Sequence, residues 1–219
     1  MKTPILYSFK RCPYAMRARM AIKLANISCE IREIKLNNKP DHMLEISPKG
    51  TVPVLILENK IIDESNEIIE WALDQVDVFK GNLNNYEINL SEDLINIFDV
   101  KFKFHLDRYK YANRYDDSSN EDHRSECMKI LDELNIIISK EKWIFGKNIN
   151  KLDISILPFI RQFRIADPKW FDDQTSIPNI KRILKNFFES KLLKETMINY
   201  KVWEEGSKPV YFPTLNSSD

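Results

Sequence analysis

Residues 5–15 read Ile-Leu-Tyr-Ser-Phe-Lys-Arg-Cys-Pro-Tyr-Ala, and this stretch decides the fold. Its apolar first half predicts a short strand over 3–9. Apolar residues spaced by three and four then predict a helix over 12–26. Pro13 suits the first turn of that helix, where a missing N–H costs nothing. The chain is therefore expected to open with a strand that turns directly into a helix at a cysteine.

The rest of the first third alternates strand and helix patterns. Apolar and charged residues alternate over 29–36, which predicts a second strand. Ser65 is the expected N-cap of a later helix. The resulting order is βαβαββα. The elements still to be named are a short helix over 41–46, strands over 52–57 and 60–63, and a helix over 65–78.

Only helical patterns follow. Gly81 and four asparagines indicate a linker over 80–90. We therefore predict an α/β domain over 1–79 and an all-α bundle over 91–219. The helices of the second domain are expected over 91–115, 121–142, 152–166, 177–188 and 190–199, before an irregular tail over 203–219.

Charge and composition exclude several classes of protein. Lys and Arg together number 33, as do Asp and Glu, so no net positive field attracts nucleic acid or an anionic membrane surface. No apolar run reaches the roughly 20 residues of a membrane span, and the first residues lack the apolar core of a secretory signal. Three cysteines cannot all pair within the chain, which fits a reducing compartment. We expect a cytoplasmic protein without nucleic-acid or membrane partners.

Cys12 is the candidate nucleophile. A helix N-terminus presents unpaired N–H groups and a partial positive charge, and Arg11 and Arg17 add positive charge nearby. Such a setting lowers the pKa of a cysteine, and the thiolate is the nucleophile of disulfide exchange. The alternative is a buried structural cysteine. The strand-to-helix turn argues against that alternative, because such turns place ligands at the end of a sheet.

The chain lacks a second cysteine in the active-site motif, because Ala15 stands at the C-x-x-C position. A mixed disulfide on Cys12 would therefore need an external thiol to resolve it. We interpret Cys29 and Cys127 as packing residues.

Two further segments suggest a ligand of peptide character. Pro53 opens the third strand, and the local sequence leaves both cis and trans open for the Val52–Pro53 bond. A cis bond would turn the backbone of Val52 toward the cysteine, where an extended ligand can pair with it. Glu64 can bind a ligand ammonium, while Ser65 and the helix N-terminus can bind a ligand carboxylate.

In combination these segments resemble the glutathione transferase superfamily, and within it the cysteine-containing omega-like classes and their bacterial relatives. The resemblance implies a thioredoxin-like first domain and an all-α second domain. A looser part of it is Asn150-Lys151-Leu152-Asp153, which looks like the helix-capping box of the family. The strongest parts are Tyr7 to Ala15, Asn38-Lys39-Pro40, Ser47 to Leu55, and Asp63-Glu64-Ser65.

The resemblance also implies roles for individual residues. It implies that Cys12 forms a mixed disulfide with glutathione, the cosubstrate. Lys39 would reach the glycyl carboxylate, Val52 beside Pro53 would pair with the cysteinyl backbone, and Glu64 and Ser65 would hold the γ-glutamyl end. Tyr7 could be mistaken for the hydroxyl catalyst of other classes, but Cys12 occupies the helix start.

The function expected from these residues is a glutathione-dependent thiol transferase or dehydroascorbate reductase. The alternatives are conjugation of glutathione to an electrophile, and a non-enzymatic interaction protein on the same fold. The second substrate is a small molecule or a disulfide, and the three histidines are too scattered to imply a metal. The resemblance implies a homodimer. Candidate second-substrate residues are Phe102, His105, Tyr109, Phe159 and Trp203.

Overall fold

The computed structural model describes residues 2–76, 78–79, 81–115 and 120–213. The chain divides into two compact units. An α/β unit combines the N-terminal part through Val78 with the C-terminal part from Ser190, and a helical unit runs from Phe79 to Glu189. In the described part of the chain no helix is long and apolar enough to span a bilayer.

The α/β unit is built on a five-stranded sheet in the order β4-β3-β1-β2-β5. β1 and β2 pair in parallel and the other pairs are antiparallel. The first seven elements follow the predicted order βαβαββα, so this part of the prediction is confirmed. These elements are β1 (Ile5–Ser8), α1 (Pro13–Leu24), β2 (Cys29–Glu33), α2 (Asp41–Ile46), β3 (Val54–Ile56), β4 (Ile61–Ile62) and α3 (Ser65–Gln75).

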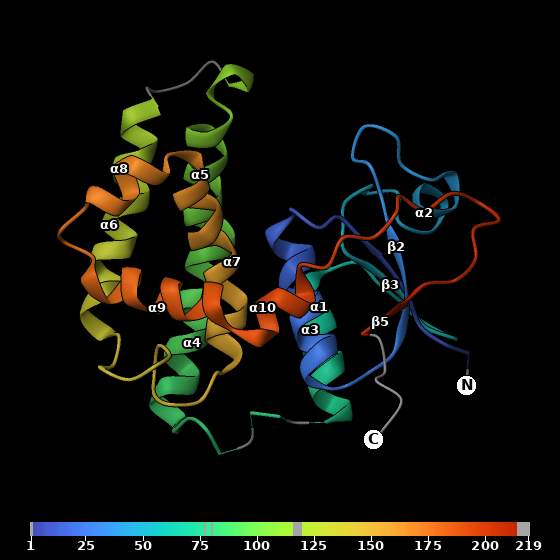
Figure 1. The fold of residues 1–219 in the computed structure, drawn as a ribbon, viewed down its shortest axis with the longest axis horizontal. Helices are drawn as coiled ribbons and strands as arrows, with labels where there is room; N and C mark the ends of the chain where they lie inside the picture. The colour runs from blue at the N-terminus through green and yellow to red at the C-terminus, as the bar shows by residue number, and fades with distance from the viewer. Residues whose placement is uncertain (1, 77, 80, 116–119, 214–219) are drawn as a thin grey trace. The chain divides into compact units, whose positions relative to one another are not determined.

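Neighbouring side chains of β1 point to opposite faces of the sheet, because side chains alternate along a strand. Leu6 packs in one core cluster with Ile22 of α1 and Ile68 of α3. Tyr7 packs in a second cluster with Met43 of α2. Figure 1 shows α1 and α3 side by side along the sheet, with α2 on its other side. Each fully buried aliphatic side chain in these clusters contributes about 1.5–3 kcal/mol.

The last part of the chain returns to the α/β unit, which corrects two predictions. α10 (Lys191–Thr196) packs on α1, and β5 (Tyr211–Phe212) pairs with β2. Residues 190–213 therefore do not belong to the helical bundle, and the tail is not wholly irregular. The outer edge of β2 carries unpaired backbone groups that the returning chain can satisfy. A strand of two residues is too short to leave a periodic pattern in the sequence.

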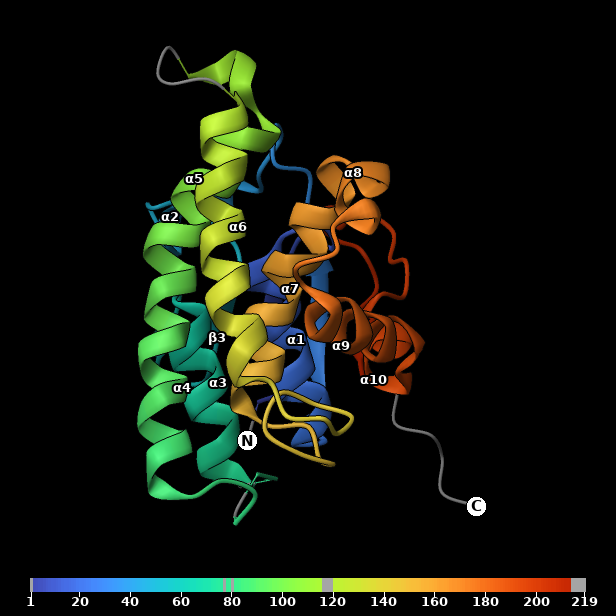
Figure 2. The same ribbon diagram turned by 90° about the vertical axis from the view of Figure 1, so that its left-hand side faces the viewer.

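The helical unit centres on one long run of helix. α4 (Asn85–Ile97) continues through a π-helical turn (Phe98–Phe102) into α5 (Lys103–Lys110), which Figure 2 shows as a single rod beside α6. α7 packs against both α4 and α5. The other elements are a short 3₁₀ turn (Ala112–Arg114), α6 (Asn120–Ile137), α7 (Lys151–Ala166), α8 (Pro168–Asp173) and α9 (Pro178–Glu189).

Helix starts explain where the predicted boundaries fail. The linker predicted over 80–90 is too long, because Asn84 caps α4. Its side chain accepts from Glu87 N, and the Glu87 carboxylate accepts from Asn84 N. The short α8 was not predicted. The capping box of α7 is confirmed: Asn150 Oδ1 accepts from Leu152 N and Asp153 N, and Asp153 accepts from Asn150 N. Lys80 of the predicted linker, and residues 116–119 between the first two helices predicted for the second domain, lie outside the described residues.

The two capping boxes differ in burial, and this difference predicts different costs of removal. Asn150 is 1% exposed, so Asn150→Ala leaves buried N–H groups unpaired and should lower the free energy of unfolding by about 2 kcal/mol. Asn84 lies at the surface, and Asn84→Ala should cost only about 0.5–1 kcal/mol. Urea unfolding of both variants measures the difference. An equal loss, or a larger one for Asn84→Ala, would contradict the assignment.

Candidate active site

Cys12 lies at the N-cap of α1. Its backbone N–H donates to Phe9 O at 2.9 Å, and its carbonyl accepts from Met16 N at 2.9 Å. The residue is half-buried and has extended backbone angles, and Pro13 follows as the first helical residue. The sulfur therefore stands at the positive end of the helix, as predicted from the sequence, where a thiolate is stabilised.

The Val52–Pro53 peptide bond is cis, which answers the question that the sequence left open. Cys12 Sγ donates to Val52 O across 3.6 Å. Val52 itself is 6% exposed and packs in the same cluster as Tyr7. A backbone segment thus lies directly beside the thiol, at hydrogen-bonding reach.

Gly50 shapes the loop before this bond. Its φ of +63° lies in the left-handed region that favours glycine, and its N–H donates to Ser47 O at 2.9 Å. A Cβ on Gly50 would lie 3.5 Å from Lys39 Nζ. The ammonium of Lys39 therefore lies against the loop that leads into Pro53.

The N-terminus of α3 supplies two polar residues, and the structure changes the predicted position of the cap. Glu64 is the N-cap residue and Ser65 the first helical residue, so the prediction that Ser65 caps the helix is wrong. Ser65 Oγ instead accepts from Arg17 Nε at 2.9 Å, and both side chains are buried. The carboxylate of Glu64 makes no capping bond and is free to face outward.

The carboxylate of Glu64 forms an ion pair with Lys49. Lys49 Nζ contacts Glu64 Oε1 and lies 3.9 Å from Asp63 Oδ1. The hydrogen bond to Glu64 raises the pKa of Lys49 above its usual range. Because both side chains are largely exposed, such a pair contributes little to stability, and another cation can replace Lys49.

Tyr7 does not present its hydroxyl to a ligand. The residue is fully buried, its hydroxyl accepts from Arg32 NH1 at 2.8 Å, and it lies 3.0 Å from His42 Nδ1. Burial raises the pKa of the phenol. The hydroxyl is thus committed to Arg32 and His42, which favours Cys12 as the reactive group.

The other two cysteines are packed in the core, as predicted. Cys29 and Cys127 are both fully buried. Burial raises the pKa of Cys29 to about 12 and raises that of Cys127 as well. Both thiols are therefore protonated near neutral pH and poor nucleophiles.

The five candidates for a second-substrate site have different surroundings. Phe102 and Phe159 are fully buried and both pack on Phe98. His105 lies 2.8 Å from His123, measured between the two Nδ1 atoms. Trp203 belongs to the α/β unit, where its ring packs edge-on against Tyr7.

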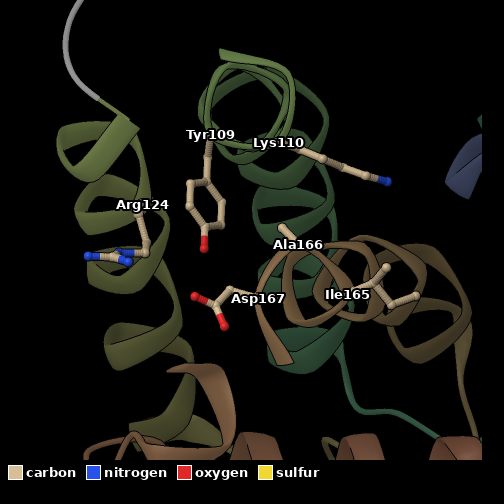
Figure 3. Close-up of a pocket in the computed structure, with 6 residues that line it drawn as sticks. All are labelled: Tyr109, Lys110, Arg124, Ile165, Ala166 and Asp167. Atoms are coloured by element: carbon tan, nitrogen blue, oxygen red, sulfur yellow. The ribbon is translucent and has the colours of Figure 1, made fainter. Parts of the chain in front are cut away.

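Tyr109 lines a pocket of about 480 Å³ in the helical unit. Figure 3 shows its hydroxyl and the Asp167 carboxylate pointing toward the same space, while Lys110 points away from it. Asp167 also caps α8 by accepting from Trp170 N at 3.1 Å. The other lining residues are Arg124, Ile165 and Ala166.

Three contacts of the site were not foreseen from the sequence. Arg17 is expected from the sequence only to add positive charge near the thiol, but its guanidinium donates a hydrogen bond to Ser65. Lys49 pairs with Glu64 across 15 positions, and Glu33 accepts from the backbone of Lys10. Each contact joins segments that are distant in the chain, and no spacing rule marks such a pair.

The groups around the thiol have the chemistry to contact both charges and the backbone of a peptide-like ligand. The residues supply a cation (Lys39), backbone groups beside the thiol (Val52), and a carboxylate at a helix N-terminus (Glu64). Within the described ranges no three metal-binding side chains cluster together.

Residues 6–78 match the family model described as the N-terminal domain of glutathione S-transferase. A probable glutathione transferase of Aplysia californica is 41% identical over 56 residues, covering 26% of this chain and 61% of that protein. Glutathione S-transferase omega-1 of Mus musculus is 27% identical over 204 residues, covering 93% of this chain and 60% of that protein. The aligned residues span less than two thirds of either relative.

The fold also matches solved structures. A glutathione transferase family member from Pseudomonas fluorescens, crystallised with two glutathione bound, superposes with a TM-score of 0.76 at 16% identity. The match covers 89% of this chain and 92% of that one. At this identity the likeness establishes the fold.

Proposed function

We propose that the chain belongs to the cytosolic glutathione transferase superfamily and acts there as a glutathione-dependent thiol transferase through a mixed disulfide on Cys12. One observation carries the proposal: the side chain at the N-cap of α1 is a half-exposed thiol. A hydroxyl at this place would hold the thiolate of glutathione for conjugation, whereas a cysteine can capture glutathione covalently.

The chemistry proceeds in two exchanges. The Cys12 thiolate attacks the glutathionyl sulfur of a mixed disulfide, a new S–S bond forms to Cys12, and the substrate leaves as a thiolate. A second glutathione thiolate then attacks the disulfide on the enzyme, releasing oxidised glutathione and regenerating the Cys12 thiolate. An external thiol is needed because Cys29 is buried and the C-x-x-C position holds Ala15. Removal of glutathione from a conjugate can follow the same cycle, with the carbon group leaving from the glutathionyl sulfur. Dehydroascorbate reduction needs a different first exchange: the Cys12 thiolate adds to a carbonyl carbon, glutathione attacks the Cys12 sulfur, and ascorbate leaves with the electron pair, so that the same mixed disulfide forms on Cys12.

Glutathione binding is proposed on the residues that the resemblance identifies. Lys39 would bind the glycyl carboxylate, and Val52 beside the cis Pro53 would pair with the cysteinyl backbone. Glu64 and Ser65, at the start of α3, would hold the γ-glutamyl ammonium and carboxylate. The closeness of Lys39 to Gly50 and of Cys12 to Val52 O supports this placement.

The thiol of Cys12 and the hydroxyl of Tyr7 can be tested against each other. Cys12→Ser should lower kcat/KM for a small glutathione mixed disulfide by at least on the order of a thousandfold. Tyr7→Phe should keep most of the activity, because the Tyr7 hydroxyl is bound to Arg32 and His42. Steady-state kinetics with the mixed disulfide and with a model aryl halide measure both reactions. A fully active Cys12→Ser variant, or a wild-type enzyme active only on the aryl halide, would overturn the proposal.

Glu64 is proposed to bind the ligand ammonium, which predicts an effect on glutathione binding alone. Glu64→Gln keeps the shape but removes the charge, so the KM for glutathione should rise by about tenfold with kcat little changed. Glu67→Gln is the matched control, because Glu67 lies exposed in the first turn of the same helix. An unchanged KM in Glu64→Gln, or an equal rise in Glu67→Gln, would show that the γ-glutamyl end binds elsewhere.

A homodimer is proposed from the resemblance and from an exposed apolar pair. Val100 is 65% exposed and Phe104 is 47% exposed, and they lie one helical turn apart. Burial of such side chains against a second copy is a common basis of two-fold pairing. Light scattering at micromolar concentration should give twice 26.0 kDa for the wild type and the monomer mass for Val100→Glu. Ile136→Glu, which changes an exposed residue of α6, should remain a dimer; a monomeric wild type refutes the proposal.

A further inference from the structure

Glu33, the last residue of β2, contacts the loop that carries the nucleophile. The residue is 7% exposed, and its Oε1 accepts from Lys10 N at 2.6 Å. Lys10 stands two positions before Cys12, in the turn closed by the bond from Cys12 N to Phe9 O. A buried carboxylate therefore fixes the backbone immediately ahead of the N-cap of α1.

Arg19 of α1 compensates the charge of Glu33. It is fully buried, and its NH1 lies 3.8 Å from Glu33 Oε2. Burial raises the pKa of Glu33, while the bond from Lys10 and the charge of Arg19 oppose this rise. No protein group in the described ranges hydrogen-bonds Glu33 Oε2, so the two oxygens have separate roles. Oε1 holds the loop and Oε2 faces the guanidinium.

The C-terminal segment, residues 198–212, encloses this pair. Arg19 NH2 donates to Ile198 O at 3.4 Å, and the rings of Tyr200 and Phe212 lie 5.5 and 5.4 Å from the guanidinium carbon. The backbone of Glu33 accepts from Trp203 N at 2.8 Å. The segment also reaches the loop itself, because Asn199 Oδ1 accepts from Lys10 Nζ at 2.5 Å.

We infer that Glu33 is a positioning residue for Cys12 and that the C-terminal segment holds Glu33 and Lys10 in place. One chain of contacts runs from Tyr200 through Arg19 and Glu33 to the Lys10 N–H. A second, direct contact joins Asn199 to the Lys10 side chain. The inference deepens the proposed function, since it concerns the same thiol. By this inference, the C-terminal segment helps to hold the Cys12 thiol in position.

The test separates the reach of the Glu33 side chain from its charge. Glu33→Asp keeps the charge that Arg19 requires but shortens the side chain, so the carboxylate cannot reach Lys10 N. Glu33→Gln keeps the reach and an acceptor oxygen but leaves Arg19 buried without a counter-charge, which lowers stability. Alkylation of Cys12 by iodoacetamide, followed by intact mass well below the unfolding temperature, should be about tenfold slower in Glu33→Asp. Glu33→Gln should alkylate close to the wild-type rate despite its lower Tm.

A control and a second variant complete the experiment. Glu30→Gln changes another partly buried glutamate of β2, one that pairs with Arg32, and should alkylate like the wild type. Asn199→Ala leaves the buried pair intact and should slow alkylation through Lys10 alone. A wild-type rate in Glu33→Asp, or rates that follow Tm across the Glu33 variants, would overturn the role of Glu33. A wild-type rate in Asn199→Ala would overturn the role of the C-terminal segment.

Alkylation needs no glutathione, so this result is independent of the proposed reaction. If the wild type fails to exchange glutathione disulfides, the proposed function falls and the positioning of Cys12 is still measured. If exchange occurs but alkylation is insensitive to Glu33 and Asn199, only the positioning role falls.

Discussion

The structure of the site depends on the turn between β1 and α1. The bond from Cys12 N to Phe9 O ends the strand segment, and Pro13 begins the helix. This turn places the sulfur at the positive N-terminal end of α1 and beside Val52 O. The remaining groups of the proposed glutathione site can act only if the thiol is held there. The core clusters on both faces of β1 keep the strand in register.

The features encoded locally could be predicted from the sequence. Alternation, helical spacing and Pro13 identified the first seven elements, and the N-cap place of Cys12 followed from them. The contacts made across distance could not be predicted. Serine commonly caps helices, yet the Ser65 hydroxyl accepts a hydrogen bond from Arg17 of another helix. Asn84 looked like a linker residue but starts α4, because a capping residue and a loop residue have the same chemistry.

The returning C-terminal segment is the clearest case of a feature without a local signal. β5 spans only Tyr211–Phe212 and exists because β2 offers an open edge. The returning segment also covers Arg19, which is fully buried and has few hydrogen-bond partners. A buried arginine in α1 is tolerable only where a carboxylate such as Glu33 faces it. The charge pattern of β2 thus has a tertiary reason that alternation alone does not reveal.

The central claim is that Cys12 captures glutathione covalently. Intact mass of the native protein after incubation with oxidised glutathione tests it most directly. The account predicts that the wild type gains one glutathionyl group, that added reduced glutathione removes it, and that Cys12→Ser gains none, since Cys29 and Cys127 are buried. An unmodified wild type, or an adduct that persists in Cys12→Ser, would contradict the account.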